Sequence, residues 1–326
     1  MIKLTYENWQ EEAYAQQWLN NVSERTRKNY IERFPKWLTF VKMSPTEQIE
    51  KRIADLRSNE LRERSWFEGK VIEFKNFLVT QKYKPWTIHG YLTAVLSFFS
   101  NNRLRLSFAR KDLTVETQEQ DKVLSEWILI NEEARVIYSL SDIRDRALFL
   151  VLYQSGFSES DVSALNIENL RDVYTQKDVY EHEGNLFIQK KREKTDVMQR
   201  TVISAECIHD IKAMLKARGS PKDGALFVSP KGERLDIRFI NEAIKKLVQK
   251  AFPEKANLFK TKSLRDAFND ALLRAEITAE VKDSMFGHKR EGAKGHYAIS
   301  PTTILEAYDK AFKYLSINGG TSQKRH

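Results

Sequence analysis

Residues 113–122 divide the chain into two parts with different sequence patterns. The segment reads LTVETQEQDK, with little hydrophobic content and no periodicity, which is typical of a linker. The chain has 326 residues, more than one small core needs, because domains usually contain roughly 100–200 residues. We therefore expect two domains, over 1–112 and 123–326, each with its own hydrophobic core.

The first part is predicted to be a bundle of helices. Ser23 has the character of a helix cap, and large apolar residues recur at helical spacing from Tyr30 to Val41. Further helices are expected over 45–57, through the apolar positions between Trp66 and Leu78, and from residue 85 to 99. Four helices over about ninety residues make a small bundle, with the regularly spaced aromatic residues in its core.

The second part mixes helices with two short strands. Helices are predicted near 131–139, 142–156, 159–165, 205–218, 236–251, 263–274, 278–285 and 301–315. Two alternating segments, 185–189 and 200–204, flank the charged run KKREKTD over 190–196, which is typical of a hairpin with a charged turn. The predicted fold class is mainly α with a small β-sheet, confined to an α/β second domain.

The terminal helix over 301–315 carries one apolar stripe. Such a stripe can pack on its own domain or on a neighbouring protomer. Both arrangements are open, with exchange between protomers slightly preferred.

The net charge of +9, from 54 Lys and Arg against 45 Asp and Glu, favours polyanionic partners. Basic residues gather near predicted helix ends in the first part, where side chains and helix N-termini can contact phosphates. An ordinary solvated face explains them equally well. The candidates for DNA binding are Arg25, Arg27, Lys28, Lys82, Lys84, Arg103 and Arg105.

The compartment is indicated by what the sequence contains. Cys207 is the only cysteine, so no intramolecular disulfide can form, and the first residues have no secretory-signal pattern. No apolar run approaches the roughly 20 residues that a membrane helix needs. We expect a cytoplasmic protein without membrane segments.

The segment MFGHKREGAKGHY over 285–297 places Tyr297 nine residues after His288, and KSLRD over 262–266 supplies Arg265 upstream. A tyrosine hydroxyl, with a pKa of about 10, needs nearby cations if it is to attack a phosphate. Arginine suits this task because its guanidinium stays charged and donates two parallel hydrogen bonds to phosphate oxygens. These residues predict a phosphate-attacking tyrosine; a core tyrosine after a Gly-His turn is the alternative.

These motifs resemble the tyrosine recombinase (phage integrase) family, and the Xer-like members from archaea or bacteria in particular. FGH over 286–288 matches the family's Leu-Gly-His, and the spacing to Tyr297 is the family's. KSLRD stands where the family has His-x-Leu-Arg-His, so Lys262 replaces the first histidine and Asp266 the second. The resemblance implies a helical core-binding (SAM-like) bundle followed by a catalytic domain.

The resemblance also implies the roles of the site residues. Tyr297 is implied to attack the phosphate, Arg265 and His288 to bind its oxygens, and Lys262 to serve as a further donor. The family carries a lysine in the hairpin turn that protonates the departing 5′ oxygen. Lys194 fits that pattern best, with Lys190 and Lys191 as competitors in the same segment.

One position departs from the family. Members usually read Thr/Ser-Gly-Leu-Arg-x-Ser-Glu-Leu, whereas this chain reads SGFSESDV over 155–162, so Ser158 stands at the position of the first arginine. Three explanations are open: another arginine reaches in, the enzyme is slow, or the serine marks decay or a deliberate substitution that leaves DNA binding intact. The arginines considered for the first explanation are Arg144, Arg146 and Arg171.

The implied function is site-specific recombination of double-stranded DNA for a mobile element, in integration or resolution, through a 3′-phosphotyrosine. No metal, nucleotide or other cofactor is implied, since the phosphotyrosine retains the energy of the broken bond. Family members imply a homo-oligomer, a dimer on a site and a tetramer in synapsis, associated with the nucleoid. The alternatives are an inactive DNA-binding member of the fold and a type IB topoisomerase.

Overall fold

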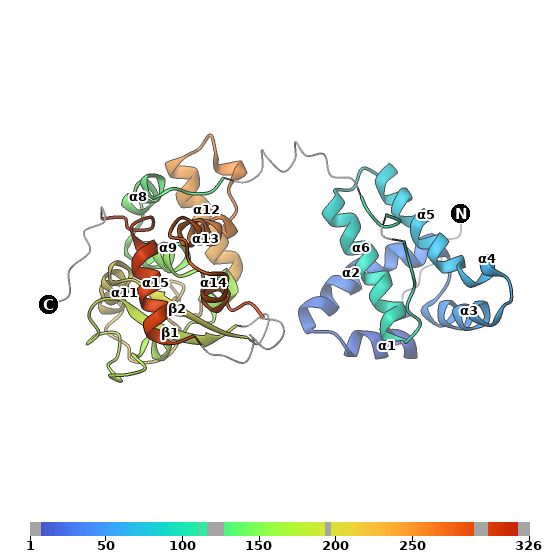
Figure 1. Cartoon of the computed structure of the whole chain (residues 1–326), viewed down its shortest axis with the longest axis horizontal. Coiled ribbons are helices and arrows are strands. Elements are labelled where there is room, and N and C mark those ends of the chain that lie inside the picture. Colours follow the sequence, from blue (N-terminus) through green and yellow to red (C-terminus); the bar gives the residue numbers. More distant parts are fainter. Residues whose placement is uncertain (1–7, 110, 116–126, 193–196, 290–298, 319–326) are drawn as a thin grey trace. The chain divides into compact units, whose positions relative to one another are not determined.

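The computed structural model describes residues 8–109, 111–115, 127–192, 197–289 and 299–318. It divides into two compact units, Met1–Glu119 and Gln120–His326 (Figure 1). Each unit has its own cluster of buried hydrophobic side chains. The residues are therefore organised around two cores.

Unit 1 is entirely helical in its described part. Ser23 caps α2 as the sequence indicates, since it accepts a hydrogen bond from the Thr26 amide. The structure adds a capping box between Ser44 and Glu47 at the start of α3. Two short helices, α1 and α4, were not among those predicted. The elements are η1 (Trp9–Glu11), α1 (Ala13–Asn20), α2 (Glu24–Val41), α3 (Pro45–Arg57), α4 (Leu61–Arg64), α5 (Trp66–Thr80) and α6 (Pro85–Asn101).

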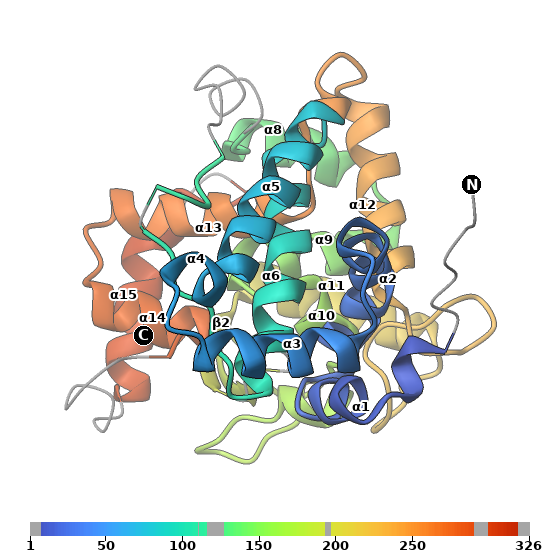
Figure 2. The ribbon, with the colours of Figure 1, turned by 90° about the vertical axis from the view of Figure 1, so that its right-hand side faces the viewer.

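The core of unit 1 is aromatic, as predicted. Trp18, Phe34 and Phe98 lie in mutual ring contact with centroids 4.7–5.4 Å apart, and none is exposed to solvent. These rings join α1, α2 and α6, and α5 packs against α6 and α2 (Figure 2). Phe77 was also expected in the core, yet it is 37% exposed, because it sits at the edge of the cluster and contacts mainly Phe40 and Phe74.

Unit 2 is helical apart from one two-stranded sheet, which confirms the predicted fold class. β1 (Leu186–Lys191) and β2 (Met198–Ile203) pair antiparallel, with Leu186 opposite Ile203 and Lys191 opposite Met198. Lys190 and Lys191, predicted in a turn, belong to β1. The helices are α8 (Asn131–Ser139), α9 (Ile143–Ser155), α10 (Glu159–Ser163), η2 (Ile167–Leu170), α11 (Ala205–Ala217), α12 (Ile237–Ala251), η3 (Ala256–Leu258), α13 (Lys262–Arg274), α14 (Ala279–Phe286) and α15 (Pro301–Phe312).

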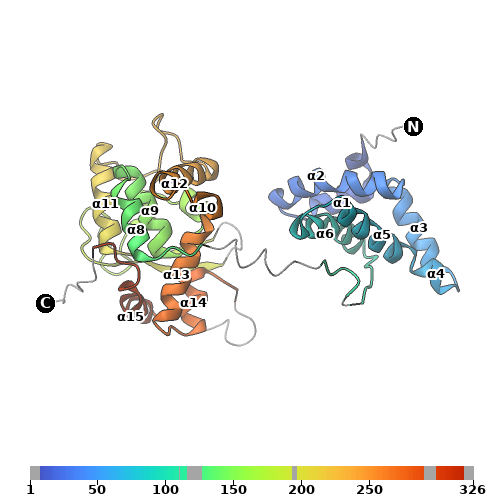
Figure 3. The ribbon, with the colours of Figure 1, turned by 90° about the horizontal axis from the view of Figure 1, so that it is seen from above.

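Helix α9 is the centre of unit 2. Every residue from 147 to 155 is buried, and the helix packs against α11, α12, α13 and β2 (Figure 3). A helix that is apolar all round in this way belongs in a core. Its C-terminal end is therefore held rigidly, and that end carries the SGFSESDV segment.

Helix α15 packs on its own unit, the arrangement that the sequence ranked second. Its apolar stripe lies against α13, α14 and the hairpin (Figure 1), and Ile304, Tyr308 and Ala311 are fully buried there. The apolar stripe is buried within the chain because the hairpin and α13 present apolar surface to it.

Candidate functional site

The junction between α9 and α10 positions Ser158. Helix α9 ends at Gly156, whose φ of 71° lies in the left-handed region, and a Cβ there would overlap the Phe268 ring. Ser158 then caps α10: its hydroxyl accepts from the Asp161 amide and donates to Asp161 Oδ2. The Ser158 side chain thus caps a helix at the position where the family carries a cation.

Arg265 lies in the second turn of α13 and reaches across to two other segments. Its guanidinium donates to the Gly156 carbonyl and, at 3.0 Å, to the Phe286 carbonyl at the end of α14. Its Cζ also lies 4.7 Å from the centre of the Phe286 ring. Burial, followed by the nearby Arg192 cation, lowers the pKa of Arg265 to about 10, so the side chain stays charged at neutral pH.

His288 follows α14 and, like Arg265, contacts the Phe286 ring. Gly287 ends the helix with a φ of 60°, and the His288 amide donates back to the Asp283 carbonyl at 2.9 Å. The imidazole stacks on the Phe286 ring, with centroids 5.5 Å apart, and its Nδ1 lies 3.4 Å from Asp283 Oδ1. The ring is 54% exposed, so it is free to approach a ligand outside the fold.

Lys262 does not join this group through any described contact. It lies at the start of α13, is 69% exposed, and pairs with Asp266 at 2.9 Å one helical turn later. The two residues that replace the family's histidines therefore bind each other.

Lys194 and Tyr297 lie outside the described residues. Their neighbours in the chain are described: the Arg192 amide donates to the Val197 carbonyl at 2.9 Å, and Lys289 and Ile299 flank the segment that contains Tyr297. The roles implied for Lys194 and Tyr297 stay predictions.

Of the three arginines considered as replacements for the one missing at 158, two make contacts elsewhere and the third is exposed. Arg144 pairs with Asp145 at 2.8 Å, Arg146 stacks over the Tyr138 ring at 5.1 Å, and Arg171 is exposed after η2. No described contact joins any of them to Ser158 or Arg265.

The structure adds Gln199 and Arg192 to the site, and the sequence analysis missed both. Gln199 on β2 is fully buried, and its Nε2 donates to the Met285 carbonyl at 2.7 Å and the Gly156 carbonyl at 3.4 Å. Arg192, directly after β1, donates to the Gly287 carbonyl at 3.3 Å. The alternation in MQRTVI was the available signal, because it sets the polar Gln199 on the same strand face as Thr201 and Ile203.

The seven basic residues predicted to bind DNA are all exposed, but they do not form one cluster. Lys82 and Lys84 precede α6, whereas Arg103 and Arg105 follow it. The 17 residues of that helix separate the two pairs by about 25 Å. Arg25, Arg27 and Lys28 lie in the first turns of α2, where Lys28 pairs with Glu24 at 2.8 Å.

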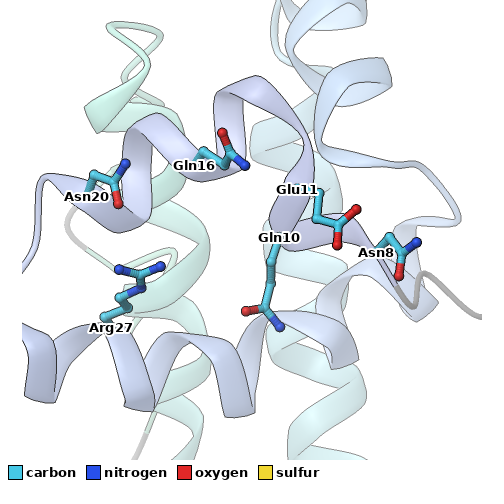
Figure 4. Close-up of a pocket in the computed structure, with 6 residues that line it drawn as sticks. All are labelled: Asn8, Gln10, Glu11, Gln16, Asn20 and Arg27. Atoms are coloured by element: carbon cyan, nitrogen blue, oxygen red, sulfur yellow. The ribbon is translucent and has the colours of Figure 1, made fainter.

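Arg27 also borders a polar cleft near the start of unit 1 (Figure 4). The other side chains around the cleft are Asn8, Gln10, Glu11, Gln16 and Asn20. Within the described ranges, no three His, Cys, Asp or Glu side chains gather in a way that could hold a metal ion. A helix long and apolar enough to cross a membrane is likewise missing from the part of the chain that the structure describes.

Comparison with known proteins places this chain in a family. The model of the phage integrase family matches residues 126–301, more than half of the chain. Tyrosine recombinase XerC of Syntrophus aciditrophicus is 22% identical over 313 residues, which cover 89% of this chain and 92% of that protein. XerC of Natranaerobius thermophilus is 24% identical over 250 residues, covering 74% and 81%.

Two solved structures share the fold. A lambda integrase dimer bound to a COC′ core site aligns with a TM-score of 0.56 at 11% identity, over 90% of this chain and 97% of that one. The Tn1549 transposon integrase in complex with transposon right end DNA aligns with a TM-score of 0.55 at 13% identity, over 90% and 96%. This chain belongs to the phage integrase family, that of the tyrosine recombinases, and the resemblance stated from its motifs is confirmed.

Proposed function

We propose that this protein is a site-specific DNA recombinase that cleaves and rejoins double-stranded DNA through a 3′-phosphotyrosine at Tyr297. The observation that carries the proposal is the position of Arg265. Its guanidinium links the Gly156 carbonyl in the SGFSESDV segment with the Phe286 carbonyl, two residues before His288. Three motifs far apart in the sequence thus meet around one partly buried cation.

The chemistry requires charge stabilisation around a phosphate. The Tyr297 hydroxyl releases its proton to solvent as its oxygen attacks phosphorus, a tyrosyl–phosphorus bond forms, and the bond to the 5′ oxygen breaks. Arg265 and His288 would donate hydrogen bonds to the nonbridging oxygens, on which negative charge builds in the transition state. Lys194 would give a proton to the departing 5′ oxygen, and Lys262 would be a further donor.

Rejoining reverses these steps with a second strand. A 5′-hydroxyl from the partner duplex attacks the phosphotyrosine, and the tyrosine leaves with its proton restored. The bond broken and the bond formed are equivalent phosphodiesters, so no cofactor is required to drive the exchange.

The partner is double-stranded DNA, and the two similar solved integrases were captured on core-site and transposon-end DNA. The seven exposed basic residues of unit 1 would contact the phosphate backbone outside the cleavage site. We propose a dimer on each site, a tetramer in synapsis, and a location at the nucleoid in the cytoplasm.

A covalent-capture experiment tests the proposal. The protein is incubated with nicked duplexes that carry a randomised core, denatured, and separated from unbound DNA; the DNA that remains attached is sequenced. We expect adducts that share one core sequence and are missing with Tyr297→Phe. Adducts of equal yield with Tyr297→Phe would assign the chemistry to another residue and overturn the proposal.

Ser158 supports a second candidate, a DNA-binding protein without cleavage activity, because its side chain caps a helix and offers no charge. That candidate predicts binding of the selected duplex without any adduct. A type IB topoisomerase would form the adduct and relax supercoiled DNA but would not exchange strands between two sites. Strand exchange between two labelled duplexes therefore separates the three.

A further inference from the structure

The site has one cation fewer in its motif than the family provides. Ser158 stands at the first arginine position, and its hydroxyl is engaged by Asp161. A phosphate in the transition state would lose a bidentate donor there unless another segment supplied one, and one such donor is worth about 10²–10³ in rate.

Arg192 lies within reach of the same carboxylate. Its Nε is 3.5 Å from Asp161 Oδ2, the oxygen to which Ser158 donates, and its Nη1 donates to the Gly287 carbonyl at 3.3 Å. The side chain is only 9% exposed, and that of Asp161 1%. The guanidinium is therefore held between the Ser158 segment and the turn that carries His288.

The pleat of the hairpin directs Arg192 to this place. Side chains two residues apart share a strand face, so Arg192 continues the face of Ile188 and Lys190, opposite Thr201 and Gln199. The latter two donate to the Ser155, Gly156 and Met285 carbonyls. The backbone bond from Arg192 to Val197 extends the ladder by one pair and fixes the residue at its end.

Gly287 leaves room for the arginine stem. A Cβ at Gly287 would overlap Cδ of Arg192 and come within 2.9 Å of Gln199 Cβ. The backbone of the Gly-His turn thus lies directly against the aliphatic part of Arg192. This close approach sets the guanidinium beside the turn and not in solvent.

Two arginines consequently meet at one helix end. Arg265 donates to the Phe286 carbonyl and Arg192 to the next carbonyl along, that of Gly287. The negative end of the α14 dipole favours both cations, but they repel each other, and the Arg192 cation is among the causes that lower the pKa of Arg265. A phosphate bound between them would remove that repulsion.

We propose that Arg192 supplies the second guanidinium for the scissile phosphate, in place of the arginine that Ser158 replaces. Asp161 acts as the positioning residue through its ion pair with Arg192 Nε. Nη1 keeps its bond to the Gly287 carbonyl, which leaves the second N–H of Nη1 and both of Nη2 for the phosphate oxygens. This inference rests on the proposed function, because it assigns a role in the same cleavage step.

The test compares Arg192→Gln, Arg192→Lys and the unchanged protein on the nicked duplex identified by covalent capture. Lys216→Gln, which removes one charge from an exposed position on α11, is the matched control. Each protein is given two substrates, one with a normal scissile phosphate and one with a methylphosphonate, in which a methyl group replaces a charged nonbridging oxygen. Adduct formation rate and duplex affinity are measured for each pair.

We expect Arg192→Gln to slow adduct formation by about 10²–10³ on the phosphate, with duplex affinity within a few-fold of the unchanged protein. Arg192→Lys should fall between them, since it keeps the charge but loses bidentate geometry. On the methylphosphonate the difference between Arg192→Gln and the unchanged protein should shrink to a few-fold, because the charge that the guanidinium neutralises is missing. Lys216→Gln should react normally on both.

A purely structural role for Arg192 gives a different result. It would lower adduct formation equally on both substrates, and that outcome overturns the inference, as does a normal rate for Arg192→Gln on the phosphate. If Arg192→Gln folds poorly, the double variant with Ser158→Arg decides: recovered adduct supports a replaceable guanidinium, and continued inactivity of a folded double variant contradicts it.

The two proposals fail in distinguishable ways. A Tyr297-dependent adduct from the unchanged protein upholds the proposed function whatever Arg192 does. The absence of any Tyr297-dependent adduct from all variants, including Ser158→Arg, would overturn both.

Discussion

The Ser158 hydroxyl and the Arg192 side chain converge on a single oxygen of Asp161. Ser158 donates to Oδ2, and Arg192 Nε lies 3.5 Å from the same atom. Ser158 therefore has a structural role of its own at the position where the family has an arginine. It caps α10, and through Asp161, which is buried, it is linked to Arg192, the arginine proposed to act in place of the missing one.

Replacing Asp161 by Asn should destabilise unit 2 by about 1–3 kcal/mol, since a buried group loses its hydrogen-bond partners. The amide keeps the shape but removes the carboxylate that pairs with Arg192. Chemical denaturation followed by circular dichroism measures the change. Asp142→Asn is the control: Asp142 is an exposed cap of α9, and asparagine caps equally well. Equal stability of both variants would show that the contacts of Asp161 with Ser158 and Arg192 do not stabilise unit 2.

Gly287→Ala should cost about 1–3 kcal/mol and also suppress adduct formation. The residue has a φ of 60°, and the new methyl group would displace the stem of Arg192. Gly184→Ala separates the two effects, because Gly184 has a φ of 83° but no neighbour within 4 Å of the added carbon. A Gly287→Ala protein that loses stability but cleaves normally would show that the position of Arg192 is unimportant.

Glu68→Gln should destabilise unit 1 by about 3–5 kcal/mol, because it leaves Arg52 as an uncompensated buried charge. Arg52 is 5% exposed and makes a bidentate pair with Glu68, at 2.7 and 3.0 Å. Five of the six tryptophans, at positions 9, 18, 37, 66 and 86, lie in unit 1, so tryptophan fluorescence during denaturation reports mainly on this unit. Glu73→Gln, which breaks an exposed pair with Lys70, should change stability by less than about 1 kcal/mol. Similar losses of stability in Glu68→Gln and Glu73→Gln would show that the buried ion pair contributes no more than the exposed one.

Cys207 should be unreactive toward thiol reagents until the chain unfolds. It is buried, and burial raises its pKa well above the usual value of 9.0, so the folded state holds the proton that the unfolded chain releases. The protonated Cys207 thiol therefore contributes to the free energy of unfolding. This contribution is complete below pH 9.0 and is lost as the pH rises from there toward the folded-state pKa. The drop in melting temperature between about pH 8 and about pH 10 measures this loss, and Cys207→Ala should make the drop smaller. Rapid labelling of the folded protein would contradict the prediction.

Duplex affinity should fall by about 10³–10⁵ between about 50 and 200 mM salt if six to ten phosphate contacts form. Lys84→Gln should lower the slope of log affinity against log salt by about one contact, whereas Lys216→Gln should leave it unchanged. Fluorescence anisotropy with a labelled duplex gives both slopes. A flat salt response would be incompatible with all three DNA-directed functions considered.

Local sequence signals predicted most of the secondary structure. The predicted helix over 45–57 matches the bounds of α3. The alternation around the charged run gave the hairpin, although β1 continues two residues into that run and β2 begins two residues before the predicted segment. α1 and α4 were missed because they are short, with eight and four residues.

The sequence by itself determined the caps, the hairpin and the spacing of Arg265, His288 and Tyr297, since these depend on neighbours within one or two turns. It could not choose among the arginines that might replace the one missing at position 158: it put forward Arg144, Arg146 and Arg171, and Arg192 was passed over as part of a charged turn. Only the tertiary structure decided that Arg192 lies beside Asp161 and Gly287, because that position depends on how the pleat of a hairpin docks on the ends of α9 and α14. Side-chain direction in a strand is local, but what the side chain meets is fixed by packing between segments more than thirty residues apart.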